Sequence, residues 1–274
     1  MRILITNDDG IQSPGIHELS RHIENAGYEV IVVAPDHDAS GTGTSLGRIS
    51  SEEPVHVSRH SIPGLHAEAY GISGTPALCV VTGYLEAFGP IPDVVVSGIN
   101  AGLNTGRSTL HSGTVGAALA AQNFGLQGIS VSLDGSTEWH WETAAQIAVE
   151  ILPSVGAGPI RGAFNVNVPG LPRQEVVGIR WAGLAKFGSV RSAISSVGDD
   201  QLDFHLVETG YLPDETTDLG TVRAGYASIT SLHGAVEVWN ADAKPGQRFE
   251  SSCALPGAST GDTLSPARSV LEDS

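Results

Sequence analysis

Ile3-Leu4-Ile5, near the start of the sequence, is a short apolar run, and Thr6-Asn7-Asp8-Asp9-Gly10 follows it at once as a polar cluster. A continuous apolar run of this kind is typical of a strand covered on both faces, as in a parallel sheet. The polar cluster marks the end of that strand. In open α/β sheets, ligands bind outside the carboxyl ends of the strands, so Asn7, Asp8 and Asp9 are the first candidates for a functional site.

Outward from this segment, strand patterns alternate with helical patterns as far as residue 152. The periodicity predicts further strands over residues 30–33, 93–97 and 128–133, and helices over about 16–26, 77–88, 114–124 and 137–152. Such strand–helix alternation predicts an α/β fold with a doubly wound, mostly parallel, Rossmann-like sheet.

The pattern changes after about residue 160. Strands are expected over 164–168, 176–181 and 227–232, but residues 182–218 show no regular alternation and predict an irregular arm. We expect residues 1–256 to form a single domain that includes this arm. Residues 257–274 are rich in Ser, Thr, Gly and Pro, which predicts a disordered tail.

Composition excludes several classes of partner. The 274 residues include 30 acidic and 14 basic side chains, for a formal net charge of −16. Nucleic-acid polymers and anionic membrane surfaces are therefore not expected partners, because both need clustered Lys and Arg. Two cysteines cannot build a disulfide framework in a chain of this length. With no secretory pattern at the first residues and no apolar run of membrane-spanning length, the expected location is the cytoplasm.

Polar residues at three predicted strand ends offer oxygen donors. Asp8 and Asp9 follow the first strand, Ser40 lies in the loop after the second, and Asn100 follows the third. Carboxylate, hydroxyl and amide oxygens suit Mg²⁺ or Mn²⁺ better than zinc. Such an ion would supply the positive charge that a phosphate needs and that this acidic chain otherwise lacks, which predicts metal-assisted phosphoester hydrolysis. Taken alone, Asp8-Asp9-Gly10 is more typical of a solvated turn or a helix cap.

A second candidate lies before the predicted helix at 114–124. Ser112-Gly113-Thr114 would place the free amides of a helix N-terminus near a phosphate, although an ordinary N-cap has the same sequence. His111 precedes this triplet and is a candidate to contact the substrate or to protonate a leaving group, or else a solvated histidine.

Several motifs together resemble the SurE (survival protein E) family. The resemblance covers about residues 1–232 in order and is specific, because the motifs occur in the required context. It is carried by Thr6-Asn7-Asp8-Asp9-Gly10, Ser13-Pro14-Gly15-Ile16, Val33-Ala34-Pro35 with Ser40-Gly41, Gly74-Thr75-Pro76, Pro92 to Gly102, Ser112-Gly113-Thr114-Val115-Gly116-Ala117-Ala118, Asn165-Val166-Asn167-Val168-Pro169, Thr217-Asp218 and Gly225 to Thr230.

The resemblance implies a metal-dependent 5′/3′-nucleotidase that hydrolyses nucleoside monophosphates, with one divalent ion (Mg²⁺ or Mn²⁺) per subunit and a homodimer or homotetramer held partly by the C-terminal arm. It implies catalytic roles for Asp8 and Asp9 and metal ligation by these two with Ser40 and Asn100. The phosphate pocket it implies consists of Asn7, Gly41, Asn104, Ser112, Gly113 and Thr114.

Departures from the family pattern leave alternatives open. His111 stands where tyrosine is usual, Ser13 where alanine is common, and Ser231 where proline is usual, and the segment 182–212 matches poorly. One alternative keeps the phosphatase chemistry but acts on a specialised small phosphate ester. Another is a non-catalytic nucleotide- or metal-binding regulator. A nicotinamide-dependent reductase is disfavoured, because the carboxylates after the first strand would repel a pyrophosphate.

Overall fold

The computed structural model describes residues 1–135, 138–156, 162–188, 190–197, 201–208 and 210–236. Met1–Gly234 form one compact unit and Ala235–Ser274 a second. The expected domain end at residue 256 and the expected tail at 257–274 lie outside the described residues.

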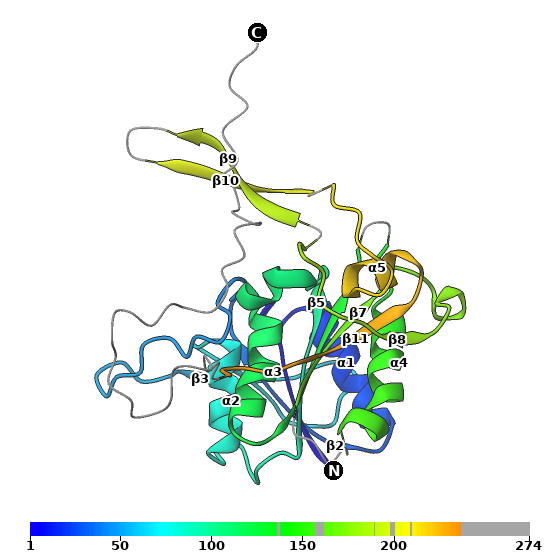
Figure 1. The fold of residues 1–274 in the computed structure, drawn as a ribbon. Coiled ribbons are helices and arrows are strands. Elements are labelled where there is room, and N and C mark those ends of the chain that lie inside the picture. Colours follow the sequence, from blue (N-terminus) through cyan, green and yellow to red (C-terminus); the bar gives the residue numbers. More distant parts are fainter. Residues whose placement is uncertain (136–137, 157–161, 189, 198–200, 209, 237–274) are drawn as a thin grey trace, which may run out of the picture. The chain divides into compact units, whose positions relative to one another are not determined.

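A nine-stranded sheet forms the centre of the first unit (Figure 1), in the order β3-β4-β2-β1-β5-β6-β7-β11-β8. The run from β4 to β7 is parallel throughout, and the antiparallel pairs are β3 with β4 and β11 with β7. The expected mostly parallel, doubly wound sheet is therefore confirmed. Its strands are β1 (Arg2–Thr6), β2 (Glu29–Pro35), β3 (Val57–His60), β4 (Ala69–Ile72), β5 (Val94–Ala101), β6 (Gln127–Leu133), β7 (Ala163–Val168), β8 (Ile179–Trp181) and β11 (Ala227–Leu232).

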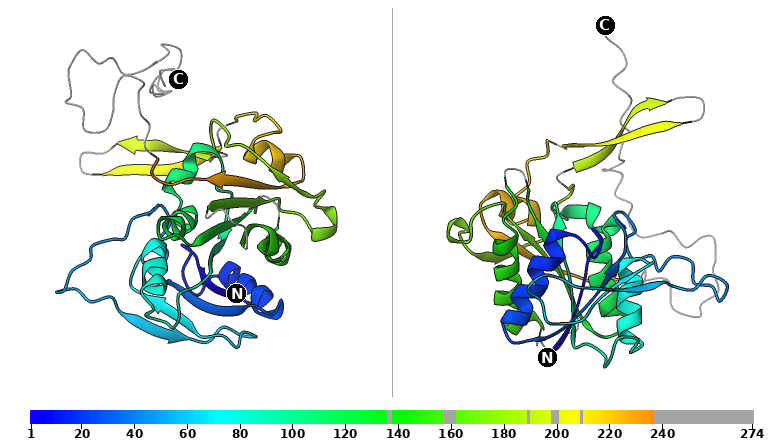
Figure 2. Two further views of the ribbon diagram at one scale, coloured as in Figure 1. Left: turned by 60° about the horizontal axis from the view of Figure 1, so that its bottom comes forward. Right: turned by 180° about the vertical axis from the view of Figure 1, so that it is seen from behind.

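Helices cover both faces of this sheet (Figure 2), as a doubly wound fold requires. They are α1 (Pro14–Asn25), α2 (Pro76–Tyr84), α3 (Gly113–Asn123), α4 (Trp141–Ile151) and α5 (Asp218–Arg223), with shorter helical turns η1 (Gly106–His111), η2 (Leu152–Gly156) and η3 (Arg173–Glu175). Helices α1 and α4 pack on one face, and α2 and α3 pack on the other.

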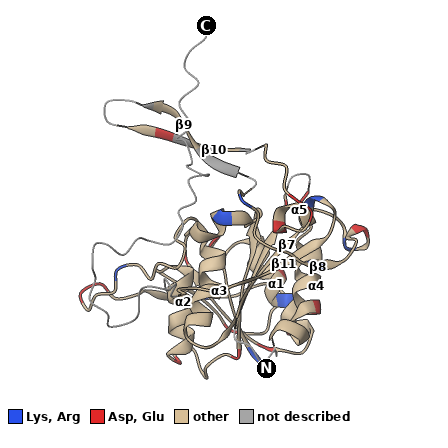
Figure 3. Cartoon of the chain, viewed as in Figure 1, with Lys and Arg blue, Asp and Glu red and all other residues tan. Residues whose placement is uncertain are grey.

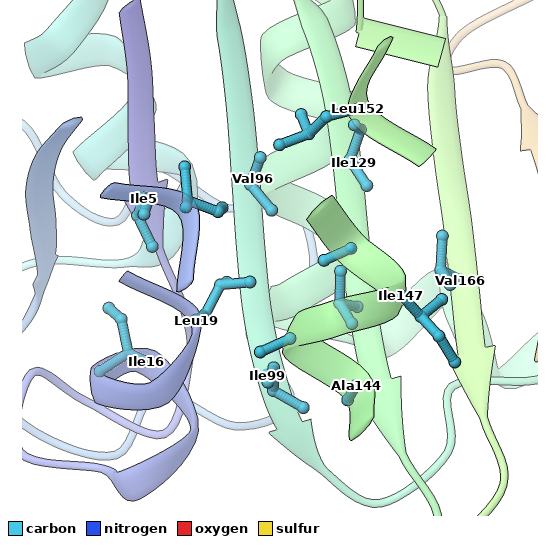
Figure 4. Close-up of a cluster of buried hydrophobic side chains, with 14 of the residues drawn as sticks. Ile5, Ile16, Leu19, Val96, Ile99, Ile129, Ala144, Ile147, Leu152 and Val166 are labelled. Atoms are coloured by element: carbon cyan, nitrogen blue, oxygen red, sulfur yellow. The ribbon is translucent and has the colours of Figure 1, made fainter. Parts of the chain in front are cut away.

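Alternate residues of the central strands supply two separate cores. In β1, Ile3 and Ile5 face α1 and α4, whereas Leu4 faces α2 and α3. Figure 4 shows part of the first core, where Leu19 of α1 and Ile147 of α4 lie against β5 and β6. Burial on both faces explains why these strands read as continuous apolar runs rather than alternating ones.

The structure corrects several predicted elements. The segment 182–218 is not wholly irregular, because β9 (Val190–Val197) and β10 (Leu202–Glu208) form a separate antiparallel hairpin. Strands of a hairpin outside the main sheet need no continuous apolar run, so the hydrophobic pattern of residues 182–218 did not indicate them. The helix predicted to reach residue 88 ends at Tyr84, since Glu86 turns the chain with a φ of 60°. The helix predicted from residue 137 begins at Trp141.

Charge is distributed sparsely over the described residues. Figure 3 shows the Lys and Arg residues scattered singly over the elements rather than gathered into a stripe. In the described part of the chain, no helix has the length and apolar character needed to cross a membrane.

Candidate active site

The carboxyl ends of β1 and β5 open onto a cavity with a volume of about 780 Å³. These strands are direct neighbours, with Thr6 paired to Ser97. The polar residues that follow them therefore meet at one edge of the sheet. Asp8 and Asp9 reach the cavity from β1, and Asn100 reaches it from β5. The strand-end prediction thus places these three residues correctly together.

Asp8 is the most firmly held group of the site. Its side chain is 3% exposed, and its Oδ1 accepts a hydrogen bond from the hydroxyl of Thr114 in the first turn of α3. Burial raises the pKa of this carboxyl above its ordinary value, while the bond from Thr114 and the backbone amides of Gly113 and Thr114 act in the opposite direction. The N-terminus of α3 is thus directed at Asp8, which it helps to keep ionised.

Asp9 carries charge that the protein does not neutralise. Burial, the neighbouring Asp8 carboxylate and, more weakly, Asp38 raise the pKa of Asp9 to about 6, although the backbone amide of Ala101 opposes this shift. That amide lies 3.4 Å from Oδ2 of Asp9. Two adjacent carboxylates that disfavour each other's ionisation are the arrangement that a divalent cation relieves.

The loop after β2 brings Ser40 and Gly41 to the same cavity. The backbone amide of Ala39 donates to the carbonyl oxygen of Asp8 at 2.7 Å, which ties this loop to the end of β1. Oδ1 of Asp38 accepts bonds from the Ser40 amide at 2.9 Å and from its hydroxyl at 2.6 Å. The Ser40 hydroxyl therefore has a fixed position, with its oxygen lone pairs still available to accept.

Asn104 is positioned by residues of two further strands. Its backbone amide donates to Oδ1 of Asn167 at 2.8 Å, and its carbonyl oxygen accepts from Nδ2 of Asn165 and Nδ2 of Asn167. Its own Nδ2 donates to the Ser132 hydroxyl at 2.9 Å. Asn165 and Asn167 of β7 thus fix the segment after β5 that forms this wall of the cavity.

The segment from η1 to the start of α3 forms another wall of the cavity. His111 is exposed and lines the cavity, and Ser112 caps α3 by accepting a bond from the Val115 amide at 3.1 Å. Gly113 is packed so closely on Asp8 that an added Cβ would lie 2.8 Å from the Asp8 Cβ and 2.9 Å from its Oδ2. Only glycine therefore allows α3 to approach the carboxylate at this position.

Eight of the predicted residues line the cavity and three do not. Those that line it are Asp8, Asp9, Ser40, Gly41, Asn100, Asn104, His111 and Ser112. Gly113 and Thr114 lie behind Asp8 and hold it. Asn7 is fully buried, and its Nδ2 donates to the carbonyl oxygen of Gly10 and the hydroxyl of Ser13, so that it shapes the turn rather than facing the cavity.

Other lining residues were missed by the sequence analysis. Asp134 and Gly135 follow β6, so the strand-end rule was a signal that could have found them. Trp139 lies in the connection between β6 and α4, two residues before α4 begins. Leu219, Val222 and Arg223 come from α5, which begins about 80 residues after Trp139, and no local pattern connects them to the site.

Comparison with known proteins identifies the family of the chain. The family model described as "Survival protein SurE" matches residues 3–189. This span contains the ends of β1, β2, β5 and β6 that border the cavity, but not α5 or β11. The chain belongs to the SurE family. The resemblance found in the sequence is therefore confirmed.

Curated SurE relatives and a solved SurE structure cover most of the chain. The "5'-nucleotidase SurE" of Desulfitobacterium hafniense is 37% identical over 235 residues, which are 85% of this chain and 91% of the relative. The "5'/3'-nucleotidase SurE" of Erwinia tasmaniensis is 36% identical over 85% of this chain and 90% of its own length. A crystal structure of the SurE protein from Aquifex aeolicus is similar with a TM-score of 0.70 and 34% identity, over 85% of this chain and 93% of that one.

Proposed function

We propose that this SurE protein is a phosphoric monoester hydrolase that converts nucleoside 5′- and 3′-monophosphates to nucleoside and phosphate in the cytoplasm. The single observation that carries the proposal is the meeting of Asp8, Asp9, Ser40 and Asn100 around one cavity, at the shared edge of β1 and β5. The names of the SurE relatives, 5′-nucleotidase and 5′/3′-nucleotidase, support the same reaction.

The residues present fit a divalent metal ion. All four donors are oxygens, and burial together with the adjacent Asp8 carboxylate raises the pKa of Asp9 to about 6. This donor set favours one Mg²⁺ or Mn²⁺ ion per subunit over zinc. When bound, such an ion neutralises a phosphate oxygen and lowers the pKa of a bound water.

The protein's own residues have separate roles in orienting the water and binding the substrate. Asp8, locked by Thr114 and almost fully buried, keeps a fixed direction. Asp9 is more open to the cavity and orients the attacking water. Asn104 and Ser112 bind the phosphoryl oxygens, and His111 contacts the substrate beyond the phosphate. Fixed donors of this kind stabilise charge that develops in the transition state, because they need no reorganisation.

Assembly is a further part of the proposal. The hairpin of β9 and β10 pairs with itself rather than with the main sheet, and Ile194 and Leu202 on it are 53% and 52% exposed. These features support a role in holding a homodimer or homotetramer. Sedimentation of the full chain, with and without residues 190–208, tests that role.

Asp8→Asn tests the function directly. We expect this variant to lose at least about 100-fold in Mn²⁺- or Mg²⁺-dependent phosphate release from AMP, because it removes a ligand charge at the centre of the site. Its circular dichroism should match that of the unmodified protein. The matched control is Glu175→Gln, an exposed carboxylate in η3 that does not line the cavity. Retained turnover in Asp8→Asn would refute the assignment.

A further inference from the structure

Asn104 lies in a segment that has no regular structure of its own. β5 ends at Ala101 and η1 begins at Gly106, so residues 102–105 belong to neither element. In such a segment the backbone N–H and C=O groups need partners from elsewhere in the molecule. For Asn104, side chains of β7 are the partners of both groups. The place of the Asn104 side chain in the cavity therefore depends on β7.

The side-chain amide of Asn167 bonds to both backbone groups of Asn104. Its Oδ1 accepts from the Asn104 N–H at 2.8 Å, and its Nδ2 donates to the Asn104 carbonyl oxygen at 2.9 Å. Only an amide side chain offers an NH₂ donor and a carbonyl acceptor together. Because the two bonds hold the backbone on either side of the Asn104 Cα, they fix the direction of its side chain as well as its position.

Asn167 lies behind Asn104 and does not itself line the cavity. It is fully buried, and in the sheet it stands between Ser132 of β6 and Ser228 of β11. Asn165, two residues earlier on the same face of β7, donates a further bond to the Asn104 carbonyl oxygen at 2.7 Å. The Asn104 N–H, by contrast, is held by Asn167.

The Asn104 side chain keeps a donor for a ligand. Its Nδ2 donates to the Ser132 hydroxyl at 2.9 Å, and since an NH₂ group carries two hydrogens, one remains for an oxygen atom in the cavity. At the other end of the same segment, Asn100 donates from its Nδ2 to the Gly102 carbonyl oxygen at 2.7 Å. The segment 100–104 thus carries a proposed metal ligand at one end and a proposed phosphate contact at the other.

We propose that Asn167 is a positioning residue for phosphate ester hydrolysis: its amide sets the place of Asn104 relative to Asn100, and thereby the place of the phosphoryl group relative to the attacking water. This inference rests on the proposed function. Asn167 touches neither the substrate nor the ion and acts through Asn104 alone. A displacement of about 1 Å at a reacting centre can cost about 100-fold in rate, so the two bonds to Asn104 affect catalysis as well as stability.

The kinetic test follows AMP hydrolysis by Asn167→Asp and Asn167→Leu from pH 8 to about pH 5.5. At pH 8 the introduced carboxylate repels the Asn104 carbonyl oxygen, and we expect kcat/KM to fall by about 10- to 100-fold. Its protonated form regains a donor, and burial favours that form, so the ratio of its kcat/KM to that of the unmodified protein should recover as the pH falls. Asn167→Leu, which neither donates nor accepts, should show the loss without the recovery.

The other titratable groups packed near Asn167 are common to the variant and the unmodified protein. β6, β11 and α3 pack against β7 and carry no titratable side chain. α5 carries Asp218 and Arg223, and α4, on the opposite face of the sheet, carries Glu142 and Glu150. Their titration affects both proteins, so a ratio that changes with pH reports the introduced carboxyl.

Ser228→Ala is the matched control. Ser228 lies beside Asn167 in the sheet and is equally buried, but its hydroxyl forms no hydrogen bond among the described residues. This variant should keep kcat/KM within about 2-fold at every pH. A merely structural role of Asn167 predicts instead that its variants unfold at lower urea concentration while the folded protein keeps its kcat/KM. That result would overturn the inference.

Binding of inorganic phosphate separates this inference from the proposed function. Calorimetric titration with phosphate in the presence of Mg²⁺ measures affinity without hydrolysis. At pH 8 we expect Asn167→Asp and Asn167→Leu to bind phosphate about 10-fold more weakly than the unmodified protein and Ser228→Ala. Equal phosphate affinity in all four proteins, or a kcat/KM of Asn167→Asp that does not recover at lower pH, would overturn the inference.

A protein that hydrolyses no phosphate ester, yet binds phosphate in a way that depends on Asn167, would count against the proposed reaction and support the positioning of Asn104. A protein that binds no phosphate at all would overturn both.

Discussion

The hydroxyl of Thr114 donates a hydrogen bond to Oδ1 of Asp8 across 106 residues of sequence. Both residues are buried; Asp8 lies two residues after the end of β1, and Thr114 is the second residue of α3. This contact joins the carboxyl end of β1 to the first turn of α3. It therefore fixes the direction of one carboxylate oxygen before any ligand enters the cavity.

Thr114→Val is expected to weaken Mn²⁺ binding by about 10- to 100-fold, because hydrogen bonds to charged groups contribute about 1.5–3 kcal/mol. Valine keeps the volume of threonine but cannot donate to Asp8. Thr114→Ser retains the hydroxyl and should bind Mn²⁺ nearly as the unmodified protein does. Calorimetric titration of the three proteins with MnCl₂ measures the effect, and equal affinities would contradict the role of this contact.

Asp9→Asn is expected to stabilise the metal-free protein at pH 7. The pKa of Asp9 is raised from 3.8 to about 6, so the folded state binds its proton more tightly than the unfolded state does, and the unmodified protein loses stability as the pH rises through this interval. Asparagine removes that loss and can still accept from the Ala101 amide. Allowing for partial exposure, we expect a gain of about 1 kcal/mol.

Urea unfolding in EDTA at pH 7 and near pH 3.5 measures this difference. The gain should be present at pH 7 and much smaller at the lower pH, where Asp9 is protonated in the folded state and largely protonated in the unfolded state. Added Mn²⁺ should stabilise the unmodified protein but not Asp9→Asn. A variant less stable than the unmodified protein at pH 7 would show that Asp9 is not electrostatically strained.

Asp218→Asn is expected to loosen the wall of the cavity formed by η1 and α5. Oδ2 of Asp218 accepts from the Gly106 amide at 2.7 Å, and Oδ1 accepts from the Ala185 amide at 2.9 Å and from the Leu219 amide at 2.8 Å. Asparagine would turn its NH₂ group toward one of these donors and leave it unpaired, at a cost of about 1–3 kcal/mol.

The stability of Asp218→Asn is measured by urea unfolding at pH 7. Glu142→Gln, an exposed carboxylate of α4, is the control and should change stability by less than about 0.5 kcal/mol. Since Gly106 begins the segment that carries His111, the KM for AMP should also rise. Unchanged stability and KM together would show that the three amides find other acceptors.

The ends of the central strands were predictable because their signals are local. A continuous apolar run followed by Asn-Asp-Asp-Gly identifies β1, and the parallel topology brings its end beside that of β5. The positions of Gly113 and Thr114 behind Asp8 were not predictable in the same way. The sequence placed them beside the phosphate, whereas the backbone amides of both are directed at the carboxylate.

The hairpin of β9 and β10 was missed for a related reason. Its strands pair with each other and lie outside the main sheet, so they are not covered on both faces and carry no continuous apolar run. Patterns of hydrophobicity detect elements through their burial, and they fail where burial is slight.

The amino-acid order alone determined the α/β architecture, the family and the oxygen donors at the carboxyl ends of the strands, because each of these depends on short-range periodicity or on motifs read in order. Only the tertiary structure decided which side chains share the cavity with them. Trp139 enters from the loop before α4, and Leu219, Val222 and Arg223 enter from α5. Trp139 is about 130 residues away from the carboxylates, and α5 is about 210 residues away from them and about 80 from Trp139. No local spacing encodes such contacts.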